Sequence, residues 1–153
     1  MKKAALLLLM AIFISLASSA QSTEDSVRQA INNLFIGMKA GNASMIVSAF
    51  GDSAVLQTIS RDKISGKIGV RNESVKDFAK SISKLAVNAA DERITFSSIK
   101  IDADLASVWT PYQFYFNGKF SHCGVNSFQL VRINGQWKIQ YLIDTKRKDH
   151  CED

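Results

Sequence analysis

The sequence predicts an α+β domain in which helices lie on one face of a long antiparallel sheet. Asn-Gly pairs at 117–118 and 134–135 separate alternating apolar runs. Such pairs are the strongest short-range signal for a β-hairpin, because both turn residues take positive φ. Two earlier segments carry apolar stripes at helical spacing. Since the helices come first and most strands last, the stripes are expected to be buried against the sheet.

The first helix is expected from about Glu24 to Ala40. Ser22 or Thr23 can accept hydrogen bonds from its free N–H groups, and Gly41 can adopt the left-handed conformation that ends it. One apolar stripe runs along this helix at positions i, i+3, i+4, i+7 and i+11. The stripe consists of Val27, Ala30, Ile31, Leu34 and Met38.

A short helix and a strand are expected next. Asn42 can cap a helix over residues 43–50, and residues 54–59 form an apolar run typical of a strand. The stretch 61–71 is basic and contains two glycines, but it lacks the spacing of a phosphate-binding or dinucleotide-binding loop. It is interpreted as a connecting hairpin, with a short strand around 64–68.

A third helix and a further strand are expected before the three-stranded part of the sheet. The helix is expected from about residue 73 to 87, with Asn72 as its cap. Residues 93–101 predict one strand, and residues 102–104 a turn. The stripe of the helix consists of Val75, Phe78, Ala79, Ile82, Leu85 and Ala86.

Three antiparallel strands are expected between residues 104 and 144. The two-residue turns fix the register, and alternating side chains then fall on opposite faces. One face is more aromatic, and we expect the helices to cover it. This face carries Leu105, Trp109, Gln113, Tyr115, Phe120, His122, Asn126, Phe128, Leu130, Trp137, Ile139, Tyr141 and Ile143.

The aromatic face has no Asp or Glu in the expected register, and Asp144 falls on the opposite face. A β-bulge would exchange the two faces beyond it. Pro111 is the expected place for a bulge, because proline cannot donate a hydrogen bond to the ladder.

The first twenty residues have the three parts of a secretory signal peptide. Lys2 and Lys3 precede an apolar run at 4–16, and Ser18-Ser19-Ala20 forms a small-residue cleavage site. We expect export to the periplasm or the cell exterior, which leaves residues 21–153 as one domain of 133 residues. Its formal charge falls from +5 to +3 when the two lysines are removed. This excess is too small to indicate nucleic-acid binding, and no membrane association is expected after cleavage.

Cys123 and Cys151 are the only two cysteines. Export would permit a disulfide between them, and closing the loop of about 28 residues would add about 3–4 kcal/mol. Two free thiols are the alternative. A zinc site on His122 and Cys123 is disfavoured, because adjacent strand residues point to opposite faces. No metal is expected.

The order of elements resembles the nuclear transport factor 2-like superfamily, also called ketosteroid isomerase-like or cystatin-like. Residues 27–59 are similar to its opening, with a helix, the GNAS turn, a short helix ending in Phe50 and a strand. The stretch DLASVWTPYQFYFNGKFSHCGVNSFQLVRINGQWKIQYLIDT resembles its closing strands, and more particularly those of its exported, lumazine-binding-like branch. The resemblance covers nearly all of residues 21–153.

This resemblance implies a curved sheet that forms a cone around a pocket, closed by the first and third helices. Many members are homodimers, and the superfamily includes isomerases, dehydratases, cyclases and non-catalytic binding proteins. Fold alone therefore does not give the function.

Our first hypothesis is an exported domain that binds a small, mostly apolar or aromatic molecule, with weak catalysis or none. Apolar walls with a few convergent polar groups suit such a ligand. The candidate pocket residues are Trp109, Gln113, Tyr115, His122, Asn126 and Tyr141.

Two other hypotheses remain open. One is an isomerase or dehydratase in which His122 is the acid/base and Asn126 or a tyrosine orients the substrate. The other is a protein-interaction module that buries the less aromatic face in a homodimer or against a partner. No cofactor is expected, because the sequence has no cofactor-binding motif. The interaction face would consist of Tyr112, Phe114, Val125, Val131 and Leu142.

Overall fold

The computed structural model describes residues 22–62 and 64–151, and the predicted signal peptide at 1–20 lies outside them. The described chain is an α+β domain, as predicted. Within it, no helix has both the length and the apolar character that a membrane span requires. The elements are α2 (Thr23–Ala40), α3 (Ala43–Ala49), β1 (Phe50–Arg61), β2 (Ile68–Glu73), α4 (Val75–Ile82), β3 (Ala90–Ile94), β4 (Ser98–Asp102), β5 (Leu105–Phe116), β6 (Lys119–Ile133) and β7 (Gln136–Thr145).

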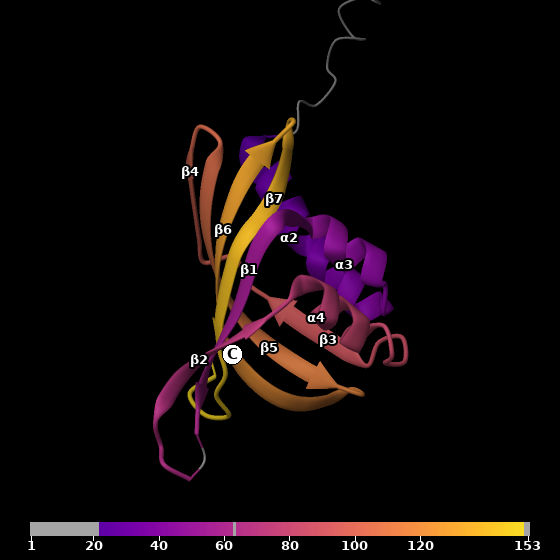
Figure 1. Cartoon of the computed structure of the whole chain (residues 1–153), viewed down its shortest axis with the longest axis vertical. Coiled ribbons are helices and arrows are strands. Elements are labelled where there is room, and N and C mark those ends of the chain that lie inside the picture. The colour runs from indigo at the N-terminus through magenta and orange to yellow at the C-terminus, as the bar shows by residue number, and fades with distance from the viewer. Residues whose placement is uncertain (1–21, 63, 152–153) are drawn as a thin grey trace, which may run out of the picture.

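The strands form one curved, open sheet with the order β2-β1-β7-β6-β5-β3, and β4 pairs with another part of β5. Figure 1 shows α2, α3 and α4 gathered on one side of this sheet. The prediction of a purely antiparallel sheet is wrong, because β1 and β7 pair in parallel. No tight turn connects these two strands, so none imposes an antiparallel register on them.

Helices α2 and α3 begin and end as their capping residues predict. The Ser22 hydroxyl accepts the N–H of Asp25 at 3.0 Å, and the Asn42 side chain accepts the N–H of Met45 at 3.0 Å. Gly41 ends α2 with φ 64°, a conformation that glycine adopts without strain.

Helix α4 is shorter than predicted. Its cap is Ser74, whose hydroxyl accepts the N–H of Asp77 at 3.0 Å, and not Asn72. Asn72 and Glu73 are instead paired with β1 as part of β2. The predicted single strand at 93–101 is likewise divided into β3 and β4, which pair with different parts of β5.

A bulge in β6 changes the predicted faces of β5. Phe120 pairs with Tyr115 as predicted, but Ser121 is an extra residue, so His122 pairs with Phe114. A bulge of this kind also bends its strand. The helix-covered side of β5 is therefore the set that includes Phe114, and not the set that includes Tyr115.

A second bulge lies in β7, where Gln140 has no partner across β6. Leu142 therefore pairs with Phe128, and Asp144 is turned to the covered face, where it is 8% exposed. Tyr141 is turned to the outer face. The predicted bulge at Pro111 is absent, because Pro111 pairs with Val125 in a regular register.

The structure also corrects the predicted interaction face. Tyr112 and Leu142 are 4% and 6% exposed beneath the helices, and Phe114 packs against the same core. Only Val125 and Val131 of that predicted set remain on the outer side, so the five residues do not form one surface.

The core lies between the helices and the covered face of the sheet. Phe128 is fully buried at its centre, and the Phe35 ring meets it edge-on with centroids 6.3 Å apart. The predicted disulfide between Cys123 and Cys151 is present. Together with paired backbone hydrogen bonds of 2.9 Å between Cys123 and Arg147, it fixes the C-terminal tail along β6.

Candidate functional site

A cavity of about 200 Å³ lies between the helices and the curved sheet. Its apolar wall comes from α2, α4 and three strands, and its polar side comes from β1, β2, β3, β5, β6 and β7 and from Lys146, just after β7. The apolar wall consists of Leu34, Phe35, Met38, Leu56, Phe78, Ile82, Phe114 and Leu142. The polar side consists of Thr58, Glu73, Glu92, Tyr112, His122, Asn126, Asp144 and Lys146.

Glu92, on β3, is the central acidic residue of this cavity. Its Oε1 accepts a hydrogen bond from Asn126 Nδ2 at 2.8 Å. Burial, together with the nearby charge of Asp144, raises the pKa of Glu92 from 4.5 to about 7. The Asn126 hydrogen bond and the charge of Lys146 act in the opposite direction but are weaker than burial. At neutral pH, Glu92 is therefore poised between its acid and its carboxylate.

Asp144 and Tyr112 form a second polar pair beside Glu92. The Tyr112 hydroxyl lies 3.2 Å from Asp144 Oδ2 and 2.8 Å from the carbonyl oxygen of Thr145. Burial raises the pKa of Asp144, although hydrogen bonds from Thr58 and Tyr112 oppose this. Burial and the charges of Glu92 and Asp144 raise the pKa of Tyr112, so its hydroxyl remains a donor.

His122 lines the cavity as a neutral ring. Its Nδ1 lies 3.1 Å from the Ser121 hydroxyl, and its ring lies 4.9 Å from that of Phe114 and 5.8 Å from that of Tyr112. Burial lowers the pKa of His122, and the charges of Lys146 and Lys148 lower it further. Among the described residues, no carboxylate is hydrogen-bonded to this ring, so it lacks the partner that an acid/base histidine uses.

The residues predicted for the pocket divide between the two faces of the sheet. His122 and Asn126 line the cavity. Trp109 lies on the outer face with 48% of its surface exposed.

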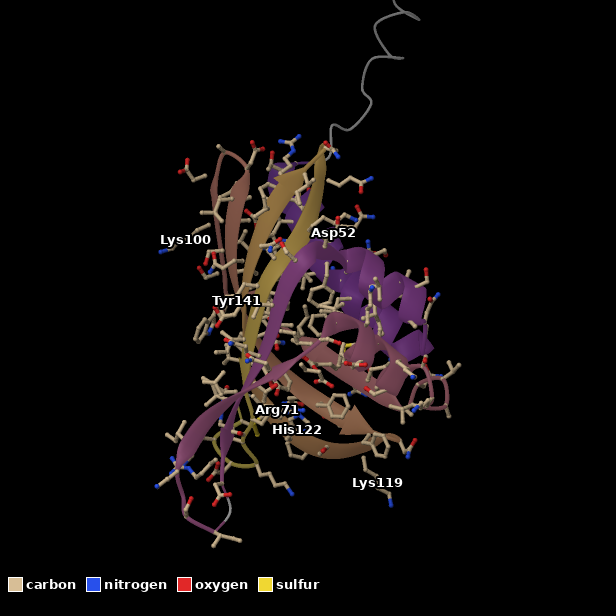
Figure 2. The ribbon with its side chains drawn as sticks, viewed as in Figure 1. Asp52, Arg71, Lys100, Lys119, His122 and Tyr141 are labelled. Atoms are coloured by element: carbon tan, nitrogen blue, oxygen red, sulfur yellow. A yellow bond between two sulfur atoms is a disulfide. The ribbon has the colours of Figure 1, made fainter. Side chains whose placement is uncertain are left out.

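The other three predicted residues are also outside the cavity lining. Gln113 and Tyr115 lie on the outer side of β5, where the Tyr115 hydroxyl donates to Gln113 Oε1 at 2.9 Å. The Tyr141 hydroxyl donates to Gln57 Oε1 at 2.7 Å, and Figure 2 shows Tyr141 on the side of the sheet away from the helices. The prediction that these residues share the covered face is wrong, because the bulges at Ser121 and Gln140 shift the pairing of the strands.

The sequence reasoning missed Glu92, Asp144 and Tyr112. The strand expected at 93–101 begins one residue after Glu92, whereas β3 begins at Ala90 and includes it. The bulge at Gln140 reverses the expected face of Asp144. Tyr112 belongs to the alternation Ala106, Val108, Thr110, Tyr112, Phe114, which is as regular in the sequence as the alternation that contains Trp109, Gln113 and Tyr115. Within the described chain, no cluster of three or more His, Cys, Asp or Glu side chains is arranged to hold a metal ion.

No family model matches the sequence, and no curated protein matches it. Solved structures do match. An NTF2-like protein of unknown function from Shewanella baltica OS155 has a TM-score of 0.63 at 13% identity, over 81% of this chain and 93% of that one. An NTF2-like protein of unknown function from Methylobacillus flagellatus KT has a TM-score of 0.61 at 18% identity, over 85% and 98%.

A third similar structure is a domain of unknown function with a cystatin-like fold from Nostoc punctiforme PCC 73102. It has a TM-score of 0.65 at 13% identity, over 88% of this chain and 82% of that one. These matches cover most of this chain and show its fold. The chain therefore has the nuclear transport factor 2-like fold, also described as cystatin-like.

Proposed function

We propose that this protein binds a small, mainly apolar molecule in the cavity between its helices and its sheet. The observation that supports this is the composition of the cavity, an apolar wall facing a side with buried polar groups. Ligand sites commonly combine apolar walls with a few polar groups that orient the ligand.

The cavity sets the size of the ligand. Its volume of about 200 Å³ lies below the roughly 300–1,000 Å³ of sites that hold drug-sized molecules. The ligand is therefore a compact molecule of about one ring, with its polar end toward Asn126 and Glu92.

Export is part of the proposal. The signal-like sequence at residues 1–20 motivates it, and the disulfide between Cys123 and Cys151 fits an oxidising compartment. The homodimer implied by the resemblance stays a prediction, and sedimentation analysis of the mature chain would test it.

Binding can be tested with 2-phenylethanol, followed by NMR chemical shifts of the mature protein. Leu56→Trp would fill the cavity from β1, whereas Val55→Trp adds the same ring at the adjacent position, which is 44% exposed. We expect the changes that 2-phenylethanol causes in the chemical shifts of cavity residues to be lost in the Leu56 variant and to persist in the Val55 variant. Met38→Trp, from α2, is the alternative block if the first variant does not fold. Ligand-induced shift changes that persist in a folded Leu56→Trp or Met38→Trp variant would refute the proposal.

A second candidate function is proton transfer of the isomerase or dehydratase type. The observation that favours it is the pKa of about 7 at Glu92, because general acid/base groups work best near the operating pH. Glu92 suits this role better than His122, whose pKa is lowered and whose ring has no carboxylate partner among the described residues. Under this candidate, Glu92→Gln would abolish turnover but retain binding of the substrate. Turnover that survives in this variant would exclude Glu92 as the base.

A further inference from the structure

The cavity contains more negative than positive groups. Three carboxyl side chains line it, from Glu73, Glu92 and Asp144, and the only lysine or arginine in the described lining is Lys146. Glu73 is partly compensated by Arg71, whose Nη1 lies 3.8 Å from its carboxylate. Within the described chain, Glu92 and Asp144 have no cation at this distance. The more distant charge of Lys146 acts on both, and that of Arg71 also acts on Asp144. Among the described residues, no cationic nitrogen lies within 4.0 Å of either carboxylate.

Glu92 and Asp144 are brought together by Asn126. The Asn126 amide donates to Glu92, and its backbone lies directly opposite Asp144 in the ladder between β6 and β7. The Glu92 carboxylate has one hydrogen-bond donor among the described residues, although an ionised carboxylate can accept about four. Capacity for further donors therefore remains at this point of the cavity.

Thr110 is a second group with unused hydrogen-bonding capacity on this face. It lies opposite Asn126 in the ladder between β5 and β6 and is fully buried. Its hydroxyl has no hydrogen-bond partner in the described structure. Thr110 is not part of the cavity lining, so this hydroxyl lies behind the polar side of the cavity and does not itself reach the ligand.

We infer that the cavity binds a protonated primary amine with a small apolar body, and that its ammonium group lies against Glu92 and Asp144. An ammonium group supplies three donors and a positive charge. Glu92 accepts one hydrogen bond from the described residues. Asp144 already accepts from Tyr112 and Thr58, so the positive charge is what both carboxylates lack at close range. The apolar body would lie against the wall formed by α2, α4 and β5. This inference rests on the proposed ligand-binding function and specifies the chemical class of the ligand.

The charged and titratable groups around the ammonium position favour a cation. Burial raises the pKa values of both Glu92 and Asp144, and the charge of Asp144 adds to the rise at Glu92. A nearby ammonium group would favour the ionised form of both carboxylates and so oppose these rises. Tyr112 stays protonated, and His122 is neutral and adds no competing charge. Lys146 is exposed at the edge of the cavity, and its repulsion of an incoming cation is therefore reduced by solvent.

Three probes of nearly equal shape test the inference on the full mature protein. They are 2-phenylethylamine, 2-phenylethanol and phenylacetate, which are a cation, a neutral molecule and an anion at pH 8. We expect the amine to bind at least tenfold more tightly than the alcohol by calorimetry, and phenylacetate to bind more weakly than both. The amine affinity should fall as the pH is lowered from 8 to 5.5, because Glu92 becomes protonated, while the alcohol affinity stays constant.

Variants connect the preference to the carboxylates. Glu92→Gln should reduce amine affinity at pH 8 at least tenfold more than it reduces alcohol affinity. Lys146→Gln should raise amine affinity a few-fold. Asp52→Asn is the matched control, because Asp52 is exposed, is not part of the cavity lining, and lies away from His122 in Figure 2. If the Glu92 variant does not fold, Asp144→Asn provides the same comparison.

The outcomes separate the two proposals. Equal binding of amine and alcohol would overturn the amine inference and support the ligand-binding function. An amine preference that survives in both the Glu92 and the Asp144 variants would also overturn the amine inference and support the ligand-binding function. Failure of all three probes to bind would overturn both.

Discussion

Glu92→Gln should make the protein more stable at neutral pH and leave its stability almost unchanged near pH 4.5. The pKa of Glu92 is raised by burial from 4.5 to about 7. When folding raises the pKa of an acid, the free energy of unfolding is highest below the unfolded pKa, where the acid is protonated in both states. It then falls as the pH rises through the folded pKa. The pH window of this loss therefore runs from about 4.5 to about 7.

The size of the effect follows from the pKa shift. Each unit corresponds to about 1.4 kcal/mol, so the carboxylate form of Glu92 costs about 3 kcal/mol in the folded state above pH 7. Glutamine has nearly the same shape and keeps an oxygen that can accept the Asn126 hydrogen bond. The variant should therefore be about 3 kcal/mol more stable than wild type at pH 8.

Urea unfolding of both proteins between pH 4.5 and 9 measures this difference. With a typical slope of about 1–3 kcal/mol per molar, the midpoint of the variant should be about 1–3 M higher at pH 8. The two midpoints should converge near pH 4.5. Asp52→Asn serves as the exposed control, and its difference from wild type should not follow this pH window. Parallel wild-type and Glu92 variant curves across the whole range would refute the assignment of a raised pKa to Glu92.

Three further predictions concern the framework of the site. Phe128→Ala should lower the free energy of unfolding by about 3–5 kcal/mol, because Phe128 is fully buried, and Trp109→Ala should lower it much less in the same chemical denaturation. Gly124→Ala should prevent normal folding or greatly reduce the melting temperature, since its Cβ would overlap the Thr145 carbonyl oxygen and lie 2.7 Å from the Tyr112 ring; a wild-type melting curve would contradict this. Replacing Cys123 and Cys151 by serine should reduce stability by about 3–4 kcal/mol, as expected for a sequence separation of 28, and dithiothreitol should then have no additional effect on the melting temperature.

The elements that local chemistry determines could be predicted from the sequence. Ser22, Gly41 and Asn42 act at helix ends through their own side chains or backbone freedom, and the two Asn-Gly turns lie where predicted. Each of these signals depends on a few neighbouring residues. The pairing of Cys123 with Cys151 was also accessible, because the sequence has no other cysteine.

The composition of the cavity depends on properties that are not local. Ser121 and Gln140 carry no residue-type signal for a bulge, yet they decide the faces of Phe114 and Asp144. The face of Glu92 depends on the pairing of β3 with β5. The sequence predicts one continuous strand at 93–101, and not the separate strands β3 and β4. The raised pKa of Glu92 then depends on groups from three strands, which only the folded chain brings together.

The two bulges also separate the shape of the cavity from its chemistry. If Ser121 were deleted, Tyr115 and Phe120 could stay paired and Phe114 could still meet His122, now in a straight strand. The same holds for Gln140, whose removal would leave Leu142 opposite Phe128. Single-residue deletions at these points would therefore reduce the curvature of the sheet around the cavity and keep the same side chains facing it. Evolution or protein engineering could thus adjust the depth of this hollow through chain length, and its selectivity through substitution, as two independent variables.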